Sequence, residues 1–204
     1  MTLSEFDNEV RKDYNIVCGC DEAGRGPLAG DVFAAAVVFD KDTVIEGIND
    51  SKKLTAKKRE ELFDEIMEKA VDFSIQTATV AEIEEINILN AAMLSMKRAV
   101  EDMDIKPDVC LIDGNKTPEG LGCPAIAVVK GDAKSQAVAA ASILAKVARD
   151  RYMEQMAEVY PEYQFEKHKG YGTKLHYEMI DKFGPCEIHR MSFLKKYYAK
   201  KNGK

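Results

Sequence analysis

Apolar and polar positions along the chain follow two periods, which predict five strands and five helices. Apolar runs rich in β-branched residues predict strands over residues 16–22, 31–39, 73–79, 109–114 and 125–129. Apolar residues at helical spacing predict helices over residues 56–70, 83–96, 133–160 and 174–183, and a basic helix closes the chain. The first three strands read as antiparallel, whereas helices separate the last two. The pattern therefore predicts an α/β fold with a mixed five-stranded sheet flanked by helices.

Length and composition are those of one soluble domain with a sizeable core. The chain has 204 residues, of which 46% are hydrophobic and 31% charged. We expect residues 1–160 to form the main part of the domain and residues 161–204 a helical extension of it. No apolar run approaches the ~18–20 residues of a membrane span, and residues 1–14 are polar and acidic, without a signal-peptide core. The sequence predicts a cytoplasmic protein without membrane contacts, and nothing in it requires more than a monomer.

Five cysteines are present, and none belongs to a C-x-x-C pair. Cys18 and Cys20 are two residues apart in a predicted strand and therefore point to one face, and Cys110 lies in another apolar run. Buried free thiols in a reducing compartment explain this usage better than a metal or redox site.

Charge is distributed unevenly along the chain. The net charge is −6, yet residues 163–204 hold ten Lys or Arg and only four Asp or Glu. A basic C-terminal segment facing an acidic pocket suits a polyanion that is bound through its phosphates. A solvated basic end explains the same side chains equally well. Both interpretations stay open for Lys195, Lys196, Lys200 and Lys201.

Four carboxylates lie at or just beyond the ends of predicted strands. Asp21 and Glu22 end the first strand, Asp113 ends the fourth, and Asp132 follows the turn after the fifth. Each alone is a common turn or helix-cap residue, but the same placement recurs in three segments. Because the ends of neighbouring strands converge on one crevice of an open α/β sheet, we expect the four to meet. Oxygen ligands without His or Cys suit two Mg²⁺ or Mn²⁺ ions and phosphodiester chemistry.

Six motifs, in order, resemble one known family. They are Asp21-Glu22-Ala23-Gly24-Arg25-Gly26, Asp50-Ser51-Lys52, Leu111-Ile112-Asp113-Gly114, Lys130-Gly131-Asp132, Ala141-Ser142-Ile143-Leu144-Ala145-Lys146 and His168-Lys169-Gly170-Tyr171-Gly172-Thr173. Each motif alone is weak, but together they span most of residues 16–193 and resemble bacterial ribonuclease HII, of the type 2 ribonuclease H family. The resemblance implies a ribonuclease H-like fold.

It also implies an endoribonuclease that hydrolyses the RNA strand of RNA/DNA hybrids and nicks duplex DNA on the 5′ side of single embedded ribonucleotides. Two divalent ions, Mn²⁺ or Mg²⁺, and products with 5′-phosphate and 3′-hydroxyl ends are implied as well. The family's metal-binding catalytic carboxylates match Asp21, Glu22, Asp113 and Asp132. The family's loop that recognises the 2′-hydroxyl at an RNA–DNA junction matches Gly24, Arg25 and Gly26. Its tyrosine that packs on the neighbouring sugar at that junction matches Tyr171, and its positions near the substrate backbone match Lys52, Ser142 and Lys146.

The three histidines have expected roles outside the acidic site, and two other classes of protein stay open. We expect His168 to be a hydrogen-bonding scaffold, His189 with Arg190 to anchor the C-terminal helix, and His176 to be a surface residue. A resolvase or exonuclease of the same architecture would share the carboxylates, but not the Gly24–Gly26 loop together with Tyr171. A non-catalytic nucleic-acid binder would bind its ligand without Mg²⁺.

Overall fold

Five strands form one mixed sheet at the centre of the computed structural model, which describes residues 1–202; positions 203 and 204, the end of the predicted extension, lie outside the described residues. The spatial order is β3-β2-β1-β4-β5. The strands are β1 (Val17–Ala23), β2 (Val32–Val38), β3 (Asp72–Ala78), β4 (Val109–Asp113) and β5 (Ala125–Val128). β1 pairs antiparallel with β2 and parallel with β4, β2 pairs antiparallel with β3, and β4 pairs parallel with β5. The predicted mixed five-stranded sheet is confirmed.

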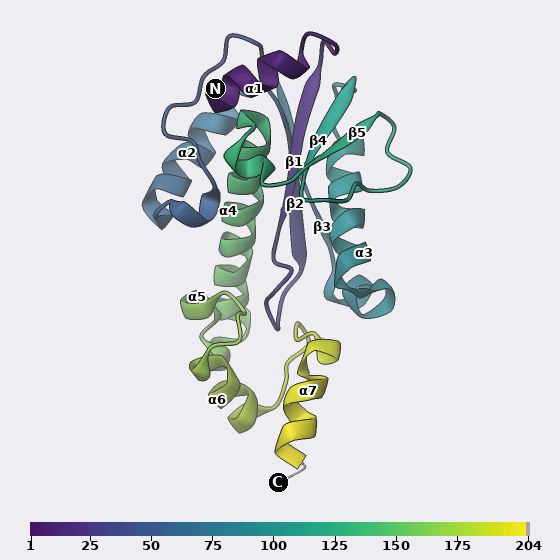
Figure 1. Cartoon of the computed structure of the whole chain (residues 1–204). Coiled ribbons are helices and arrows are strands. Elements are labelled where there is room, and N and C mark those ends of the chain that lie inside the picture. The colour runs from purple at the N-terminus through teal and green to yellow at the C-terminus, as the bar shows by residue number, and fades with distance from the viewer. Residues whose placement is uncertain (203–204) are drawn as a thin grey trace.

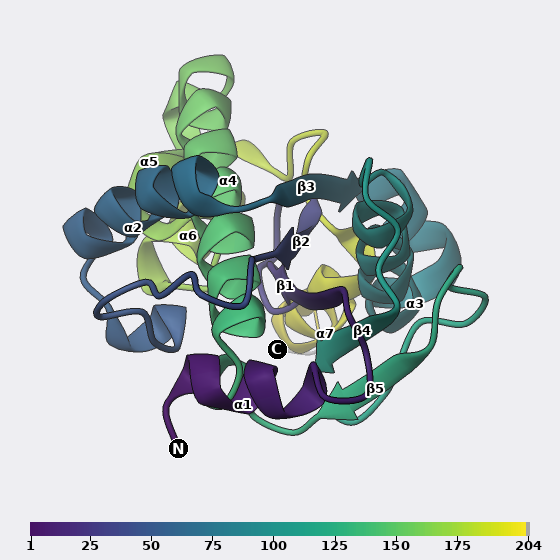
Figure 2. The same ribbon diagram turned by 90° about the horizontal axis from the view of Figure 1, so that it is seen from above.

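Helices cover both faces of this sheet (Figures 1 and 2). One face carries α1 (Leu3–Val10), α2 (Ala56–Lys69) and α4 (Gln136–Val159), and the other carries α3 (Val80–Glu101). The short α5 (Phe165–His168), α6 (Lys174–Phe183) and α7 (Met191–Asn202) gather at the end of the molecule toward which β1 runs (Figure 1). Single 3₁₀ turns lie at Ser51–Lys53, Gly131–Ala133 and Pro161–Tyr163. None of the helices within residues 1–202 is long and apolar enough to cross a membrane.

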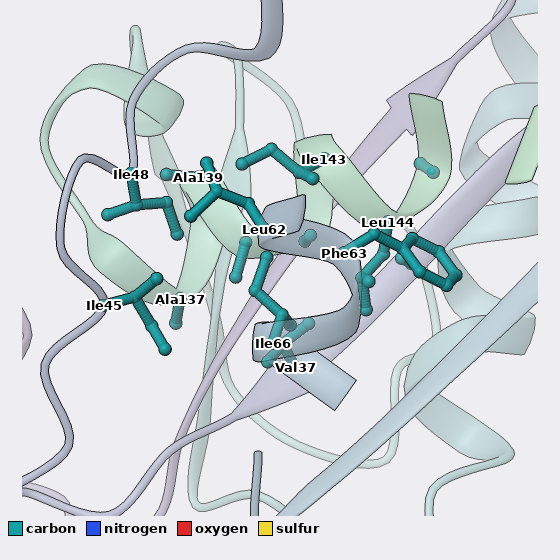
Figure 3. Close-up of a cluster of buried hydrophobic side chains, with 14 of the residues drawn as sticks. Val37, Ile45, Ile48, Leu62, Phe63, Ile66, Ala137, Ala139, Ile143 and Leu144 are labelled. Carbon is teal, nitrogen blue, oxygen red and sulfur yellow. The ribbon is translucent and has the colours of Figure 1, made fainter. Parts of the chain in front are cut away.

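Helix α4 approaches the backbone of β1 closely, because small residues meet at the contact. A Cβ atom added to Gly19 would lie 2.2 Å from the carbonyl carbon of Ala137. Ala140 and Ala141, on the same helix, are fully buried. Farther from β1, larger side chains fill the space between α2, β2 and α4, as Figure 3 shows. The path of β1 therefore fixes the position of α4.

The opposite face of β1 and β4 carries the buried cysteines. Cys18 and Cys110 are register partners on the two parallel strands, and both are fully buried, like Cys20. They pack in one cluster with Met96 from α3. All five cysteines of the chain are free thiols, of which Cys18, Cys20 and Cys110 are buried and Cys123 and Cys186 only partly buried.

Helix α1 was not predicted, because residues 1–14 are mostly polar. Its signal is a capping box, in which the Thr2 side chain accepts a hydrogen bond from the Glu5 backbone and Glu5 accepts one from Thr2. Asp7 of this helix is buried and its Oδ2 accepts a hydrogen bond from the backbone N–H of Ala137, at 2.9 Å. The first helix of the chain thus satisfies a free N–H at the start of α4.

Helix α3 is interrupted where the sequence predicts one continuous helix. Asn87 has φ +67° and ψ 163°, which are not helical values. Its Oδ1 accepts hydrogen bonds from the backbone N–H groups of Leu89 (3.0 Å) and Asn90 (3.2 Å), as an N-cap does. A new helix therefore starts at Ile88, inside the segment.

Candidate active site

The parallel pairing of β1 and β4 places two of the predicted carboxylates side by side. Cys20 is the register partner of Ile112, so Asp21 lies next to Asp113 on the neighbouring strand. Side chains alternate between the faces of a strand, and both aspartates point to the face that α4 covers. Asp21 is 7% exposed. The placement predicted from the two apolar runs is therefore present in the structure.

Asp132 reaches the same region through the turn that precedes α4. Asp113 Oδ1 accepts a hydrogen bond from the backbone N–H of Gly131 at 2.6 Å and a longer one from that of Asp132 at 3.4 Å. Lys130, just before the turn, adopts a left-handed conformation with φ +57°. The carboxylate at the end of β4 thus holds the turn that carries Asp132.

Burial and mutual repulsion act on these carboxyl groups together. Burial raises the pKa of Asp21 well above its usual range, and the charges of Glu22, Asp113 and Asp132 raise it further. Burial also raises the pKa of Glu22, although a hydrogen bond from Arg25 opposes the shift. The pKa of Asp132 is raised by burial and then by Asp113. A cation shared by these groups would relieve both effects.

A cleft of about 540 Å³ opens beside the end of β1. It is lined by Asp21 and Glu22 and by every residue for which the sequence implies substrate contact, namely Gly24, Arg25, Gly26, Lys52, Ser142, Lys146 and Tyr171. Asp113 and Asp132 do not line it, and lie behind Asp21 on the side of β4. The structure thus brings these predicted residues, from four separate segments of the chain, to one cleft.

Two loops face each other across this cleft. Gly24 has φ +102°, a conformation that residues with a side chain rarely adopt. Gly26 lies opposite Tyr171, since a Cβ added to Gly26 would be 3.8 Å from the Cε1 of that ring. Tyr171 is 43% exposed. Arg25 Nη1 lies 3.1 Å from Glu22 Oε1 in a half-exposed ion pair, so Arg25 both pairs with a carboxylate and lines the cleft.

Helix α4 supplies the wall next to Tyr171. Ser142 is 3% exposed and its Oγ has no hydrogen-bond partner within the described residues. One turn later, Lys146 Nζ lies 2.5 Å from Asp150 Oδ1 and 5.9 Å from the centre of the Tyr171 ring. Burial lowers the pKa of Lys146, while Asp150 opposes that shift. A buried hydroxyl without a partner is costly, and at a cleft it suits a polar ligand atom.

The donor set fits hard divalent cations, although it does not form a closed cage. As the side chains lie, no three His, Cys, Asp or Glu residues within 1–202 are grouped so that they could hold a metal ion. Asp113 accepts from backbone N–H groups and Glu22 pairs with Arg25. Mg²⁺ is usually bound through one or two carboxylates, water and substrate phosphates rather than by an all-protein cage. Asp21, Glu22, Asp113 and Asp132 offer only oxygen atoms, which is the donor chemistry that such a site requires.

The three histidines of the chain converge behind Tyr171. His176 is fully buried, so the prediction of a surface position was wrong. Its Nδ1 lies 2.9 Å from the carbonyl oxygen of Tyr171, and its Nε2 lies 3.0 Å from the Nε2 of His189. His168 Nε2 lies 2.9 Å from the carbonyl oxygen of Tyr163, a hydrogen bond of the kind that a scaffold role requires. Helical spacing alone gave no sign that α6 turns His176 inward onto its own N-terminal loop.

Two residues near the site were missed in the sequence, and a third, Asp50, lies in a quoted motif but had no role assigned to it. Ile88, at the restart of α3, and Phe193 of α7 give the cleft an apolar wall. Asp50 lies beside Asp132 and helps to raise the pKa of that carboxyl. Asn87 could have indicated Ile88, since Asn favours helix N-caps. Nothing in the local sequence distinguishes Phe193 from a core residue.

The fold places the protein in a known class of nucleases. The structure matches that of ribonuclease H2 from Pyrococcus horikoshii OT3 with a TM-score of 0.73 and 31% sequence identity, over 87% of this chain and 93% of that one. The fold is therefore ribonuclease H-like, a mixed five-stranded sheet between helices.

Sequence comparison then defines the family. The family profile described as Ribonuclease HII matches residues 18–196. The chain is 55% identical to ribonuclease HII from Caldicellulosiruptor bescii over 202 residues, which cover 96% of this chain and 98% of the relative. It is 58% identical to ribonuclease HII from Idiomarina loihiensis over 178 residues, 87% of this chain and 95% of the relative. The chain belongs to the ribonuclease HII family, and is a hydrolase that cleaves nucleic acid as an endonuclease.

Proposed function

We propose that this enzyme hydrolyses the RNA strand of RNA/DNA hybrids and nicks duplex DNA on the 5′ side of single embedded ribonucleotides. It does so with two divalent ions, and leaves 5′-phosphate and 3′-hydroxyl ends. One observation carries the proposal. Asp21, whose pKa is raised by burial and by three neighbouring carboxylates, opens on the cleft that Gly24–Gly26 and Tyr171 also line.

The carboxylates are assigned to metal binding. Asp21, Glu22, Asp113 and Asp132 would hold Mg²⁺ or Mn²⁺, in keeping with the divalent-metal dependence that the family implies. When bound, such ions lower the pKa of an attacking water and stabilise charge on the leaving oxygen of a phosphodiester. The fold positions these carboxylates. The β1–β4 pairing fixes the backbones of Asp21 and Asp113, and Asp113 accepts a hydrogen bond from the turn that carries Asp132.

Recognition of ribose is assigned to the loop after β1 and to Tyr171. The 2′-hydroxyl is both donor and acceptor, and it distinguishes RNA from DNA at a given position. Gly24 and Gly26 have no side chains, so a sugar can approach the peptide groups between them. The half-exposed Tyr171 ring faces Gly26 and offers a flat surface against the neighbouring sugar.

Binding of the substrate's phosphate backbone is assigned to polar groups around the cleft and to the C-terminal extension. Ser142 Oγ, which lacks a partner within the described residues, can donate to a phosphate oxygen, and Lys146 and Lys52 add positive charge. The exposed lysines of α7 extend this charge beyond the cleft. Phosphate contacts position a nucleic acid without reading its sequence.

The test uses an end-labelled DNA duplex with one ribonucleotide, an all-DNA duplex of the same sequence, and an RNA/DNA hybrid. We expect Mg²⁺- or Mn²⁺-dependent cleavage of the first on the 5′ side of the ribonucleotide, cleavage of the hybrid, and none of the all-DNA duplex. Asp113→Asn should lose activity by orders of magnitude while remaining folded. Asp64→Asn, at an exposed carboxylate on α2, is the matched control and should cleave like wild type.

A second readout is independent of turnover. Mn²⁺ should raise the melting temperature of the wild-type protein and of Asp64→Asn, because a ligand that binds only the folded state stabilises it. The rise should be much smaller for Asp113→Asn. Cleavage of the all-DNA duplex would indicate a resolvase or exonuclease instead. Ribonucleotide binding without cleavage, unaffected by Asp113→Asn, would indicate a non-catalytic binder.

A further inference from the structure

Two fully buried arginines lie directly behind the loops that line the cleft. Arg149, on α4, is 1% exposed and Arg190, just before α7, is 0% exposed. Within the described residues, every hydrogen bond from the two guanidinium groups goes to a main-chain carbonyl, not to a carboxylate. Burying a charge is costly unless hydrogen bonds compensate it. The main-chain carbonyls that accept from the two guanidinium groups therefore offset the cost of burying their charges.

Arg190 is surrounded by the loop that follows β1. Its Nη2 donates to the carbonyl of Gly24 at 2.7 Å, and its Nη1 donates to those of Arg25 at 3.2 Å and Pro27 at 2.9 Å. Nε and Nη2 both donate to the carbonyl of Gly30, at 2.9 and 2.6 Å. All five donors of one planar group thus serve a single loop of seven residues, so its peptide planes are fixed from the inside.

Arg149 connects this loop to the one that carries Tyr171. Its Nη2 donates to the carbonyl of Ala29 and its Nη1 to that of Lys169, both at 3.0 Å. Its Cζ lies 5.9 Å from the centre of the Tyr171 ring. The contact with Gly24 is also tight, because a Cβ there would lie 2.2 Å from Arg149 Nε.

We propose that Arg190 and Arg149 are positioning residues for ribose recognition: they set the separation and orientation of the Gly24–Gly26 backbone and Tyr171 without touching the substrate. The inference rests on the proposed function of that cleft. A misplacement of about 1 Å in a reacting geometry costs ~10²-fold in rate. Lysine keeps the charge but has one nitrogen in place of the fork, and cannot reproduce the contacts of Arg190 with four carbonyls or of Arg149 with three.

The experiment measures selectivity in binding, separately from turnover. Wild type, Arg190→Lys, Arg149→Lys and the control Arg98→Lys are titrated, with Ca²⁺ as the divalent ion, with a duplex containing one ribonucleotide and with its all-DNA counterpart. Arg98 donates to the carbonyl of Thr77 and to Glu82, and does not line the cleft. Cleavage in Mg²⁺ and thermal melting are measured on the same proteins.

We expect Arg190→Lys and Arg149→Lys to lose the preference for the ribonucleotide duplex, with affinity for the all-DNA duplex unchanged. Their kcat/KM at the ribonucleotide should fall by about 10²-fold, whereas Arg98→Lys should keep wild-type selectivity. Retained selectivity in both cleft variants would overturn the inference, and so would a parallel loss of affinity for both duplexes. If neither variant stays folded, the arginines are structural and the inference is also wrong. A wild-type protein without ribonucleotide preference would instead refute the proposed function.

Discussion

Substitution of Gly19 by alanine tests whether the contact between β1 and α4 sets the geometry of the site. The added Cβ would lie 2.2 Å from the carbonyl carbon of Ala137 and 2.3 Å from the nitrogen of Val138, both backbone atoms. Ordinary contacts at a Cβ begin at 3.4 Å. The added Cβ is about 1.2 Å closer than that to the helix backbone, so β1 and α4 must separate by roughly this distance. No side-chain rotation can relieve the clash, because the neighbouring atoms belong to a helix backbone.

The expected cost follows from this displacement. Overpacking a core costs typically 1–3 kcal/mol and sometimes more, and a backbone clash belongs at the upper end. For a chain of this size ~3 kcal/mol corresponds to a fall of about 6–12 °C in melting temperature. Because α4 carries Ser142 and follows the turn of Asp132, cleavage should also fall by ~10²-fold at a temperature where the variant is folded.

The assay is thermal unfolding together with cleavage of the single-ribonucleotide duplex. Gly122→Ala is the matched control, since a Cβ at Gly122 meets nothing within 4 Å. It should melt and cleave like wild type. If Gly19→Ala melts within a degree of Gly122→Ala, the close approach of α4 to β1 does not constrain the fold, and the reasoning is refuted.

Two further predictions follow from buried titratable groups. Asp21→Asn should raise the urea midpoint at pH 7 in the absence of divalent ions while abolishing cleavage, because burial and Glu22 raise the pKa of Asp21 in the folded state. A carboxyl whose pKa is higher in the folded than in the unfolded state destabilises the fold most fully above its folded pKa, and this destabilisation disappears as the pH falls toward 3.8. An unchanged or lower urea midpoint for Asp21→Asn would contradict the prediction. Burial lowers the pKa of His176 and His189 to about 4 in the folded state. Between about pH 4 and 6.5 the unfolded chain therefore binds more protons than the folded one. As the pH falls from 8 to 5, each ring lowers the free energy of unfolding by about 2 kcal/mol. Their NMR ring signals should stay at the neutral position from pH 8 to 5, and titration near pH 6.5 would show that they are not buried as neutral groups.

The sheet and the acidic residues of the site could be predicted because they depend on local patterns. Apolar runs of strand length that end in Asp or Glu place charge at a sheet edge, and parallel pairing then brings Asp21 next to Asp113. The six motifs supplied the other residues that line the cleft except Ile88 and Phe193. What the pattern could not show is that Asp113 and Asp132 lie outside the cleft lining. For Asp113, hydrogen bonds from the backbone N–H groups of Gly131 and Asp132 hold the side chain in that orientation.

The supporting groups could not be predicted, because they break the usual rules of burial. Arginine is rarely fully buried, yet Arg149 and Arg190 are. Arg190 also donates to Gly30, 160 residues away in the sequence. Helix α1 was missed for a different reason. Its few apolar residues give a weak period, although the Thr2–Glu5 capping box was readable.

The adjacency of β1 and β4 has a consequence for how this enzyme can change over time. Paired strands lie ~4.8 Å apart whatever side chains they carry, because peptide hydrogen bonds set that spacing. The backbones that present Asp21 and Asp113 are therefore spaced by a property of the polypeptide itself. Core residues can be exchanged to suit a hotter or colder habitat while the spacing of these two backbones stays the same.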